Sequence, residues 1–315
     1  MYGKYIVLFA ILFTGWFLRR INFIDDKMNH SLNKFIVYFA YPCLIVHNIG
    51  TLDLDGKALG KFLLAFVLSL ACFYLYGLIC YGYAKLRKLP EEDSNIIEFA
   101  MAAPNDGFMG FPITLIFFGE TGLLYMLAHN AAMNFFCFTY GIKLVRRNCS
   151  ERRQATPRNM FRAVVKLILN PNILALILGF IISISGLHLP GAVDEYLLYI
   201  GNVATPMAMI FIGSTLAKFR FVDIIKSLVT IEASFVKLFL LPAVTLLLLY
   251  FLPIDPLIKS LVVLGSCFPS AATVSMLAEQ EGQNVGAASK VLFLSTMASI
   301  ATIPLSINVL LLLFS

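Results

Sequence analysis

The stretch Ala102-Ala103-Pro104-Asn105-Asp106-Gly107-Phe108-Met109-Gly110-Phe111-Pro112 decides the fold, because it places two prolines, two glycines and two polar residues within an apolar run. A continuous helix is not expected there, since proline removes a backbone donor and glycine weakens helices. A milder interruption, Gly265-Ser266-Cys267-Phe268-Pro269-Ser270-Ala271-Ala272-Thr273, lies in a later apolar run. The two interruptions, centred on Pro112 and Pro269, therefore predict two broken helices.

The composition indicates that lipid is part of the solvent of this chain. Of its 315 residues, 59% are hydrophobic and 13% are charged, and the mean hydropathy is +0.84, which is too apolar for a soluble globular protein. A membrane helix needs about 20 mostly apolar residues. The sequence predicts an all-α integral membrane protein with ten such helices, at residues 3–18, 31–50, 58–85, 94–118, 121–145, 162–187, 192–217, 221–252, 256–280 and 284–314.

Lysine and arginine positions predict the orientation, because positive residues are retained on the cytoplasmic side. They gather in the odd-numbered gaps between helices and are densest in the fifth gap, residues 146–161. This loop is expected in the cytoplasm and both termini outside a cell membrane, either the plasma or the inner membrane. The net charge of +6 is then explained by the basic residues that orient the chain in the membrane, and no nucleic-acid partner is expected. The first span lacks a small-residue cleavage site and is interpreted as a retained helix.

The basic loop divides the chain into two halves, residues 1–145 and 162–315, with five predicted helices each. An odd number of helices inverts the second half, as in the inverted repeats of many transporters. Tyr41-Pro42 in the first half corresponds to Thr205-Pro206 in the second, and Gly110-Phe111-Pro112 corresponds to Cys267-Phe268-Pro269. Broken helices four and nine are expected to cross, with half-helix N-termini aimed at one point that favours an anion.

At these residues the sequence resembles a known family. Asn105-Asp106-Gly107-Phe108-Met109-Gly110-Phe111-Pro112 is similar to the N-x-G-F-x-G-x-P signature of the auxin efflux carrier family, which includes the plant PIN exporters and bacterial malate or malonate permeases. The resemblance extends over essentially the whole chain. It is carried further by Asn170-Pro171-Asn172, Leu189-Pro190, Phe268-Pro269-Ser270-Ala271-Ala272, Glu281-Gly282-Gln283-Asn284, Ala287-Ala288-Ser289 and Ser295-Thr296.

The resemblance implies a ten-helix fold related to the bile-acid symporters. Helices 1, 2, 6 and 7 would form a scaffold domain, and helices 3–5 and 8–10 a transport domain that moves like an elevator. Relatives of this fold are usually homodimers through the scaffold. Plant PIN proteins have a long cytoplasmic domain in the fifth gap, which this chain lacks.

Asp106 is the foremost candidate for ion coupling, because an ionisable residue in a broken membrane helix is costly and usually functional. It would carry a proton or, alternatively, only cap the second half-helix. Asn105 would donate to a substrate carboxylate or satisfy broken backbone. Lys290 would pair with Asp106 or replace a sodium ion, or else snorkel to the cytoplasmic surface.

The remaining candidates come from other predicted helices. His129, Asn130 and Asn134 lie mid-helix in span five, with the two amides on one face. Lys237 is expected to have a partner other than Glu232. Glu98, near the start of helix four, could be an ion-gate residue, but its position at the membrane edge favours a solvated carboxylate. The complete set of predicted substrate-binding residues is Asn105, Asp106, Gly107, Pro112, His129, Asn130, Asn134, Pro269, Ser270, Thr273 and Lys290.

The sequence therefore predicts a secondary transporter of a small organic anion, such as malate, malonate or an auxin-like aromatic acid, working as a proton-coupled carrier or a uniporter. A sodium-coupled symporter or sodium/proton antiporter is the alternative, and a channel or receptor is the alternative of another class. An enzyme is not expected, because H-E-x-x-H and G-x-S-x-G are absent. No cofactor or metal is expected, since the six cysteines are scattered without a C-x-x-C pair.

Overall fold

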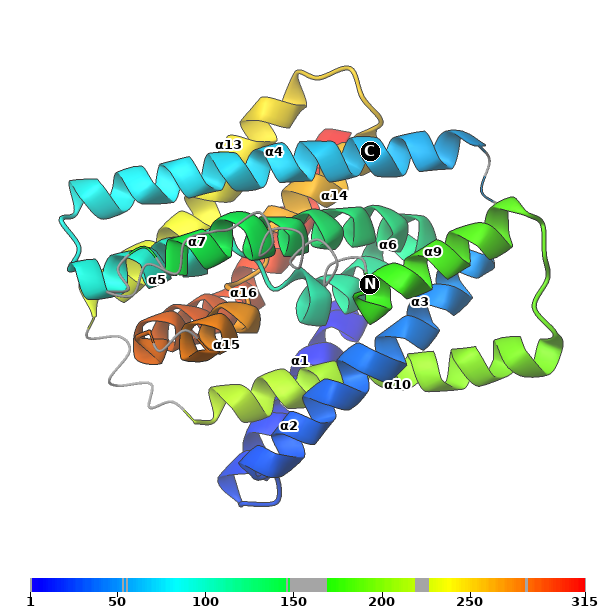
Figure 1. The fold of residues 1–315 in the computed structure, drawn as a ribbon, viewed down its shortest axis with the longest axis horizontal. Helices are drawn as coiled ribbons and strands as arrows, with labels where there is room; N and C mark the ends of the chain where they lie inside the picture. The colour runs from blue at the N-terminus through cyan, green and yellow to red at the C-terminus, as the bar shows by residue number, and fades with distance from the viewer. Residues whose placement is uncertain are drawn as a thin grey trace. The chain divides into compact units, whose positions relative to one another are not determined.

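The computed structural model describes residues 2–52, 54, 56–145, 147, 169–218, 227–280 and 283–314, and the regular structure in these ranges is helical (Figure 1). Every range predicted as a membrane span contains helix among its described residues. In the part of the chain that the structure describes, five helical segments are long and apolar enough to cross a membrane: Lys57–Leu86, Asp106–Val145, Gly191–Leu216, Leu228–Tyr250 and Val285–Phe314. The chain is thus all-helical with several membrane-capable helices, while the ten-helix inverted repeat remains a prediction.

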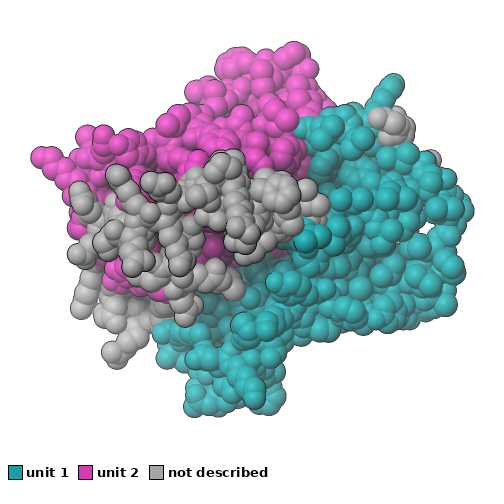
Figure 2. All heavy atoms as spheres, viewed as in Figure 1, with its two compact units in different colours: residues 1–63, 108–124, 165–219 teal, residues 64–107, 125–164, 220–315 magenta. Residues whose placement is uncertain are grey.

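The chain divides into two compact units (Figure 2). The first contains Met1–Leu63, Phe108–Leu124 and Val165–Phe219, and the second contains Leu64–Gly107, Tyr125–Val164 and Arg220–Ser315. Apart from Arg147, the predicted cytoplasmic loop at 146–161 lies outside the described residues.

In the first unit, α10 packs against α1 and α3, and α3 packs against α9. The helices approach closely at Gly15 and Gly213, where a Cβ would overlap the backbone of Ile210 and Leu12 respectively. Small residues at such contacts are typical of helix packing in membranes. The bounds are α1 (Tyr2–Arg20), α2 (Asp26–Phe35), η1 (Ile36–Ala40), α3 (Tyr41–Gly50), α9 (Pro171–Ile184) and α10 (Gly191–Leu216).

In the second unit, α16 packs against α5, α12, α14 and α15. Three elements belong partly to each unit: α4 (Gly56–Leu86), η2 (Asp106–Gly110) and α6 (Phe111–Phe136). Gly119 interrupts α6 with φ of 67°, between the predicted fourth and fifth spans. The other elements of the second unit are α5 (Glu91–Ala102), η3 (Cys137–Gly141), α7 (Ile142–Val145), α12 (Leu228–Phe235), η4 (Val236–Leu240), α13 (Leu241–Tyr250), α14 (Pro256–Cys267), α15 (Ala272–Gln280) and α16 (Val285–Phe314).

Three of the wide π-helical turns are followed closely by a proline. The turns η1, η2 and η4 end two residues before Pro42, Pro112 and Pro242 respectively. A proline ring clashes with the carbonyl four residues earlier and cannot donate to it. A π turn shifts this hydrogen-bond register. It therefore allows the helix to continue past the proline.

The first interruption lies at Pro104 and not, as predicted, at Pro112. Helix α5 ends at Ala102, and Ala103 is extended with φ of −93° and ψ of 113°. Pro112 instead occupies the second position of α6, where its missing N–H is tolerated. The second interruption is where the sequence predicts it, because Phe268 is extended directly before Pro269. In both cases the residue before proline avoids the helical region, as sterics require.

Candidate functional site

The two interruptions pair with each other through their backbones. The N–H of Asn105 donates to the carbonyl of Pro269 at 2.7 Å, and the N–H of Ala271 donates to the carbonyl of Ala103 at 2.9 Å. Pro104 and Ser270 form an antiparallel bridge between these bonds. Backbone groups that leave a helix inside a membrane must find partners within the protein. Each break provides those partners for the other.

Two polar side-chain atoms at the paired breaks have no hydrogen-bond partner among the described residues. They are Nδ2 of Asn105 and Oγ of Ser270. Asn105 is 3% exposed and Ser270 is fully buried. Leaving such a group unsatisfied costs about 1–3 kcal/mol, so a buried unpaired donor calls for a ligand or an ordered water. Asn105 and Ser270 are therefore suited to receive a polar ligand.

Asp106 is fully buried and bonds to two side chains of α6. Its Oδ2 lies 2.7 Å from Nδ1 of His129, and its Oδ1 accepts a 2.7 Å hydrogen bond from Nδ2 of Asn130. Asn134, one turn further along, donates from Nδ2 to Oδ1 of Asn130 at 3.0 Å. The three α6 residues selected from the sequence thus join Asp106 in one hydrogen-bonded network.

The imidazole of His129 is enclosed by residues that the sequence did not single out. The ring of Phe73 in α4 packs against it at a centroid distance of 4.9 Å. On α14, Gly265 leaves the space that the imidazole fills, because a Cβ at this position would overlap the ring. Glycine at 265 was visible as part of the second interruption, but its contact with His129 depends on packing.

Lys237 is fully buried in η4, and its Nζ donates to the carbonyl of Ser266 at 3.3 Å. Ser266 lies in the last turn of α14, where unpaired carbonyls carry partial negative charge that stabilises a cation. This carbonyl is the partner that the sequence could not identify. Lys237 also interacts electrostatically with Asp106.

The other predicted site residues are distributed less closely. Lys290 is exposed near the start of α16, while the described side-chain partners of Asp106 are His129 and Asn130. Pro269 is buried, whereas Gly107 and Thr273 are partly exposed. Pro112 is buried and belongs to the first unit, and the remaining predicted site residues belong to the second.

Ser295 of α16 supports the second break. The backbone N–H of Ser270 donates to its Oγ at 3.1 Å, and the same Oγ donates to the carbonyl of Val291 at 2.6 Å. In the sequence, Ser295 was named among the residues that carry the family resemblance. For Ser295 the structure adds a specific role as an acceptor.

The expectation of a solvated Glu98 is wrong. Glu98 is 1% exposed, and its carboxylate forms two hydrogen bonds with the guanidinium of Arg147, at 2.7 and 3.1 Å. The hydrogen bonds from Arg147 to this carboxylate raise the pKa of the guanidinium above its ordinary value. A position near the end of a membrane span did not imply contact with water, because Arg147 folds back over the carboxylate.

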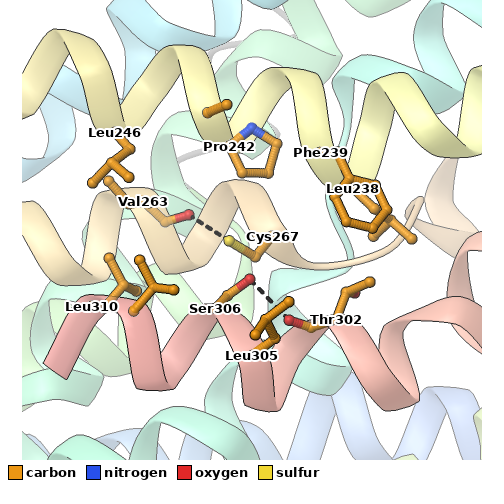
Figure 3. A pocket seen from close by; sticks show the side chains of 12 residues that line it. Leu238, Phe239, Pro242, Leu246, Val263, Cys267, Thr302, Leu305, Ser306 and Leu310 are labelled. Carbon is orange, nitrogen blue, oxygen red and sulfur yellow. Dashed lines mark hydrogen bonds between the residues drawn. The ribbon is translucent and has the colours of Figure 1, made fainter. Parts of the chain in front are cut away.

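The second unit contains a cavity of about 150 Å³ whose lining differs chemically from the Asp106 network (Figure 3). Apolar side chains from η4, α13, α14 and α16 dominate its wall, and Thr302, Ser306 and Cys267 supply the polar atoms. No charged side chain lines it. Its chemistry suits hydrocarbon and gives an anion no counter-charge.

Comparisons with known proteins show that the chain is similar to membrane transporters. The family model described as membrane transport protein matches residues 1–307. An "Uncharacterized transporter" of Methanothermobacter thermautotrophicus is 27% identical over 94% of this chain and 94% of its own length. A "Putative malonate transporter" of Rhizobium meliloti is 24% identical over 96% of this chain and 93% of its own length. The transporter YfdV of Escherichia coli is 22% identical over 98% of this chain and 96% of its own.

Proposed function

The chain belongs to the membrane transport protein family, the auxin efflux carrier family, and from that premise we propose that it is a secondary carrier of a small organic anion. The anion binds where the two breaks pair, and alternating access to the two sides of the membrane moves it across. Proton coupling or uniport are the two modes compatible with this proposal.

The observation that carries the proposal is the pair of unpartnered polar groups at the breaks. Nδ2 of Asn105 is a donor, and Oγ of Ser270 can donate or accept. Both groups are buried. Asn105 itself makes one of the two backbone hydrogen bonds between the breaks, and Ser270 lies between the two residues of the second break that make them. A carboxylate has two acceptor oxygens and satisfies such donors well. The start of α15 at Ala272 adds backbone N–H groups to the same region.

An inverted repeat with crossed helices four and nine is the architecture that we propose around this site. The antiparallel bridge between Pro104 and Ser270 supports it, because it brings the two interrupted segments together in opposite directions. The matching extended residues before Pro104 and Pro269 support it further.

An elevator movement of a transport domain against a scaffold is the proposed mechanism. The division of the chain into two units supports it. The first unit holds α1, α2, α3, α9 and α10, which correspond to the proposed scaffold, whereas α12–α16 and α5 belong to the second. We further propose a homodimer through the scaffold, both termini outside, and the basic loop in the cytoplasm.

Malonate is the first substrate to test, since one relative carries that name. The purified chain in liposomes is loaded with unlabelled malonate, and uptake of radiolabelled malonate by exchange is measured. Malate and an aromatic monocarboxylate such as indole acetate are tested in the same way. Exchange above that of protein-free liposomes is expected for at least one of the three.

Asn105→Ala identifies the site, because it removes the unpartnered donor. We expect the exchange rate to fall at least tenfold, the effect of losing roughly 1.4 kcal/mol of binding. Asn48→Ala is the matched control, since Asn48 is also a buried amide but donates to a carbonyl of its own helix, that of Leu44. Wild-type protein that moves none of the three carboxylates, or Asn105→Ala with full activity, contradicts the proposal.

A further inference from the structure

Asp106 and His129 form a buried pair whose groups are within proton-sharing distance. The imidazole Nδ1 and the carboxylate Oδ2 are 2.7 Å apart, and the side chains are 1% and 0% exposed respectively. An ionised carboxylate only accepts hydrogen bonds, so Nδ1 carries the hydrogen that joins the two groups. The second ring nitrogen, Nε2, is then the atom that gains or loses a proton.

The surroundings keep this pair together without fixing its charge. Asn130 holds the other carboxylate oxygen, and Asn134 holds Asn130. Neither amide titrates. From α4 the neutral ring of Phe73 packs against the imidazole, and from α14 Gly265 lies beside Nε2.

The titratable groups that act on the pair come from two further elements. Cys137 of η3 and Lys237 of η4 both interact electrostatically with Asp106. Lys237 is the described cation of this environment, and its ammonium is held by the carbonyl of Ser266. Among the described residues, the side chains that hydrogen-bond within the network of the pair are the amides of Asn130 and Asn134, so the geometry singles out Asp106 and His129 as the groups that share a proton.

The pair is also next to the proposed anion site along the chain. Asn105 directly precedes Asp106, and Gly265 lies four residues before Pro269 of the second break. A neutral His129 gives the pair a net charge of minus one, and a proton on Nε2 brings it to zero. Because charges interact strongly in a medium of low dielectric constant, the unprotonated pair repels an anion beside Asn105 and the protonated pair admits it.

We propose that Asp106 and His129 bind the coupling proton as one unit, with Nε2 of His129 as the protonation site, so that one proton and one organic anion cross together. This inference rests on the proposed carrier function. The proton enters on Nε2 from one side of the membrane and leaves from the same atom on the other. The N–H bond at Nε2 is the only covalent bond made and broken.

The test separates exchange, which needs no net proton movement, from accumulation driven by a pH gradient. Liposomes containing the full chain receive radiolabelled malonate, either at equal pH with malonate inside or with an alkaline interior and no malonate inside. For wild type, with potassium and valinomycin on both sides to hold the membrane potential at zero, one coupled proton allows a gradient of one pH unit to concentrate the malonate anion up to about tenfold. His129→Gln and Asp106→Asn keep hydrogen-bonding side chains, and we expect exchange at a reduced rate with an accumulation ratio of one.

His47→Gln is the matched control, because His47 and Asp194 form a second histidine–carboxylate pair at the same distance of 2.7 Å. That pair belongs to the first unit and is partly exposed, with side chains 15% and 34% accessible. His47→Gln is expected to accumulate malonate as wild type does. If His47→Gln also loses accumulation, as His129→Gln and Asp106→Asn do, the loss reflects reduced protein stability and the proposal is overturned.

The failures of the two proposals are distinguishable. Wild-type protein that exchanges malonate but ignores the pH gradient overturns the proton pair and leaves the carrier function standing, as does His129→Gln that still accumulates. Wild-type protein that carries out neither reaction overturns both. Proton uptake on addition of malonate to the detergent-solubilised wild type, followed with a pH dye, gives a readout that needs no variant, and its absence also counts against the pair.

Discussion

The first break, at residues 103–105, leads into a buried carboxylate that bonds to two side chains of α6, whereas the second, at residues 268–271, is held by a serine hydroxyl of α16. The backbones of the two breaks satisfy each other in the same way. Their side chains do not match. Backbone geometry is therefore shared between the two breaks, whereas the buried carboxylate belongs to the first.

In the proposed carrier, the backbone geometry that both breaks share would serve anion binding, and the carboxylate beside the first break would serve proton coupling. Both breaks must present extended backbone, and a proline with small neighbours is enough for that. Only one of them needs to carry a charge that changes. A second buried carboxylate would add the cost of burying another ion, which is several kcal/mol in proteins.

Asp106→Ala is expected to produce the largest loss of stability. It leaves His129 and Asn130 without their shared partner, and breaking a buried pair in this way costs about 3 kcal/mol. Unfolding of the purified protein in detergent, thermal or by denaturant, measures the change. Ser270→Ala in the second break is the counterpart, and no loss of stability is expected because its Oγ has no partner to lose among the described residues. Equal losses in the two variants would remove the distinction between the breaks.

Gly265→Ala is expected to have an intermediate effect and to show that the second broken helix supports the first. Its new Cβ overlaps the imidazole of His129, and overpacking of this kind costs about 2 kcal/mol. The control is Gly82→Ala in α4, where nothing lies within 4 Å of the new Cβ. That variant should be more stable by roughly 0.5 kcal/mol, because alanine favours helix. A Gly265→Ala protein as stable as Gly82→Ala would mean that α14 does not constrain the ring.

Ser295→Ala is expected to have the smallest effect, and it tests how the second break is held. The backbone N–H of Ser270 loses its acceptor, at a cost of about 1 kcal/mol. Ser69→Ala is the control, since Ser69 is buried but bonds only to Ala65 of its own helix, and its change should stay below about 0.5 kcal/mol. A loss at Ser295 as large as that at Asp106 would make the two breaks equivalent in energy.

Much of the fold was predictable because it follows from local patterns. Apolar runs of about 20 residues mark membrane helices wherever they occur. The interruption before Pro269 was located correctly because a residue preceding proline avoids the helical conformation. The same rule applied to both Pro104 and Pro112, and the sequence could not choose between them. The π turn that ends at Gly110 lets the helix run on past Pro112, and such turns have no clear sequence signal.

The sequence predicted most residues of the candidate site, but it did not predict which of them bond to each other. Asn130 and Asn134 share a helix face by their spacing, and the structure confirms their contact. Pairing with Asp106 was one of three alternatives for Lys290, yet the described side-chain bonds of Asp106 go to His129 and Asn130. Glu98 was expected in water and instead binds Arg147. The helical period of 3.6 residues predicts which side chains share a face of one helix. It does not predict how neighbouring helices are rotated about their own axes, and this rotation decides which faces meet.

By itself, the sequence determined that the chain is an apolar, helical membrane protein interrupted at two polar, proline-containing stretches, because hydropathy and backbone sterics act over a few residues. The tertiary structure decided which interrupted residues pair, that Gly265 makes room for His129, and that Lys237 binds the carbonyl of Ser266. Hydrogen bonds require atoms within about 3 Å of each other. Over separations of more than twenty residues, only the packing of whole helices sets such distances.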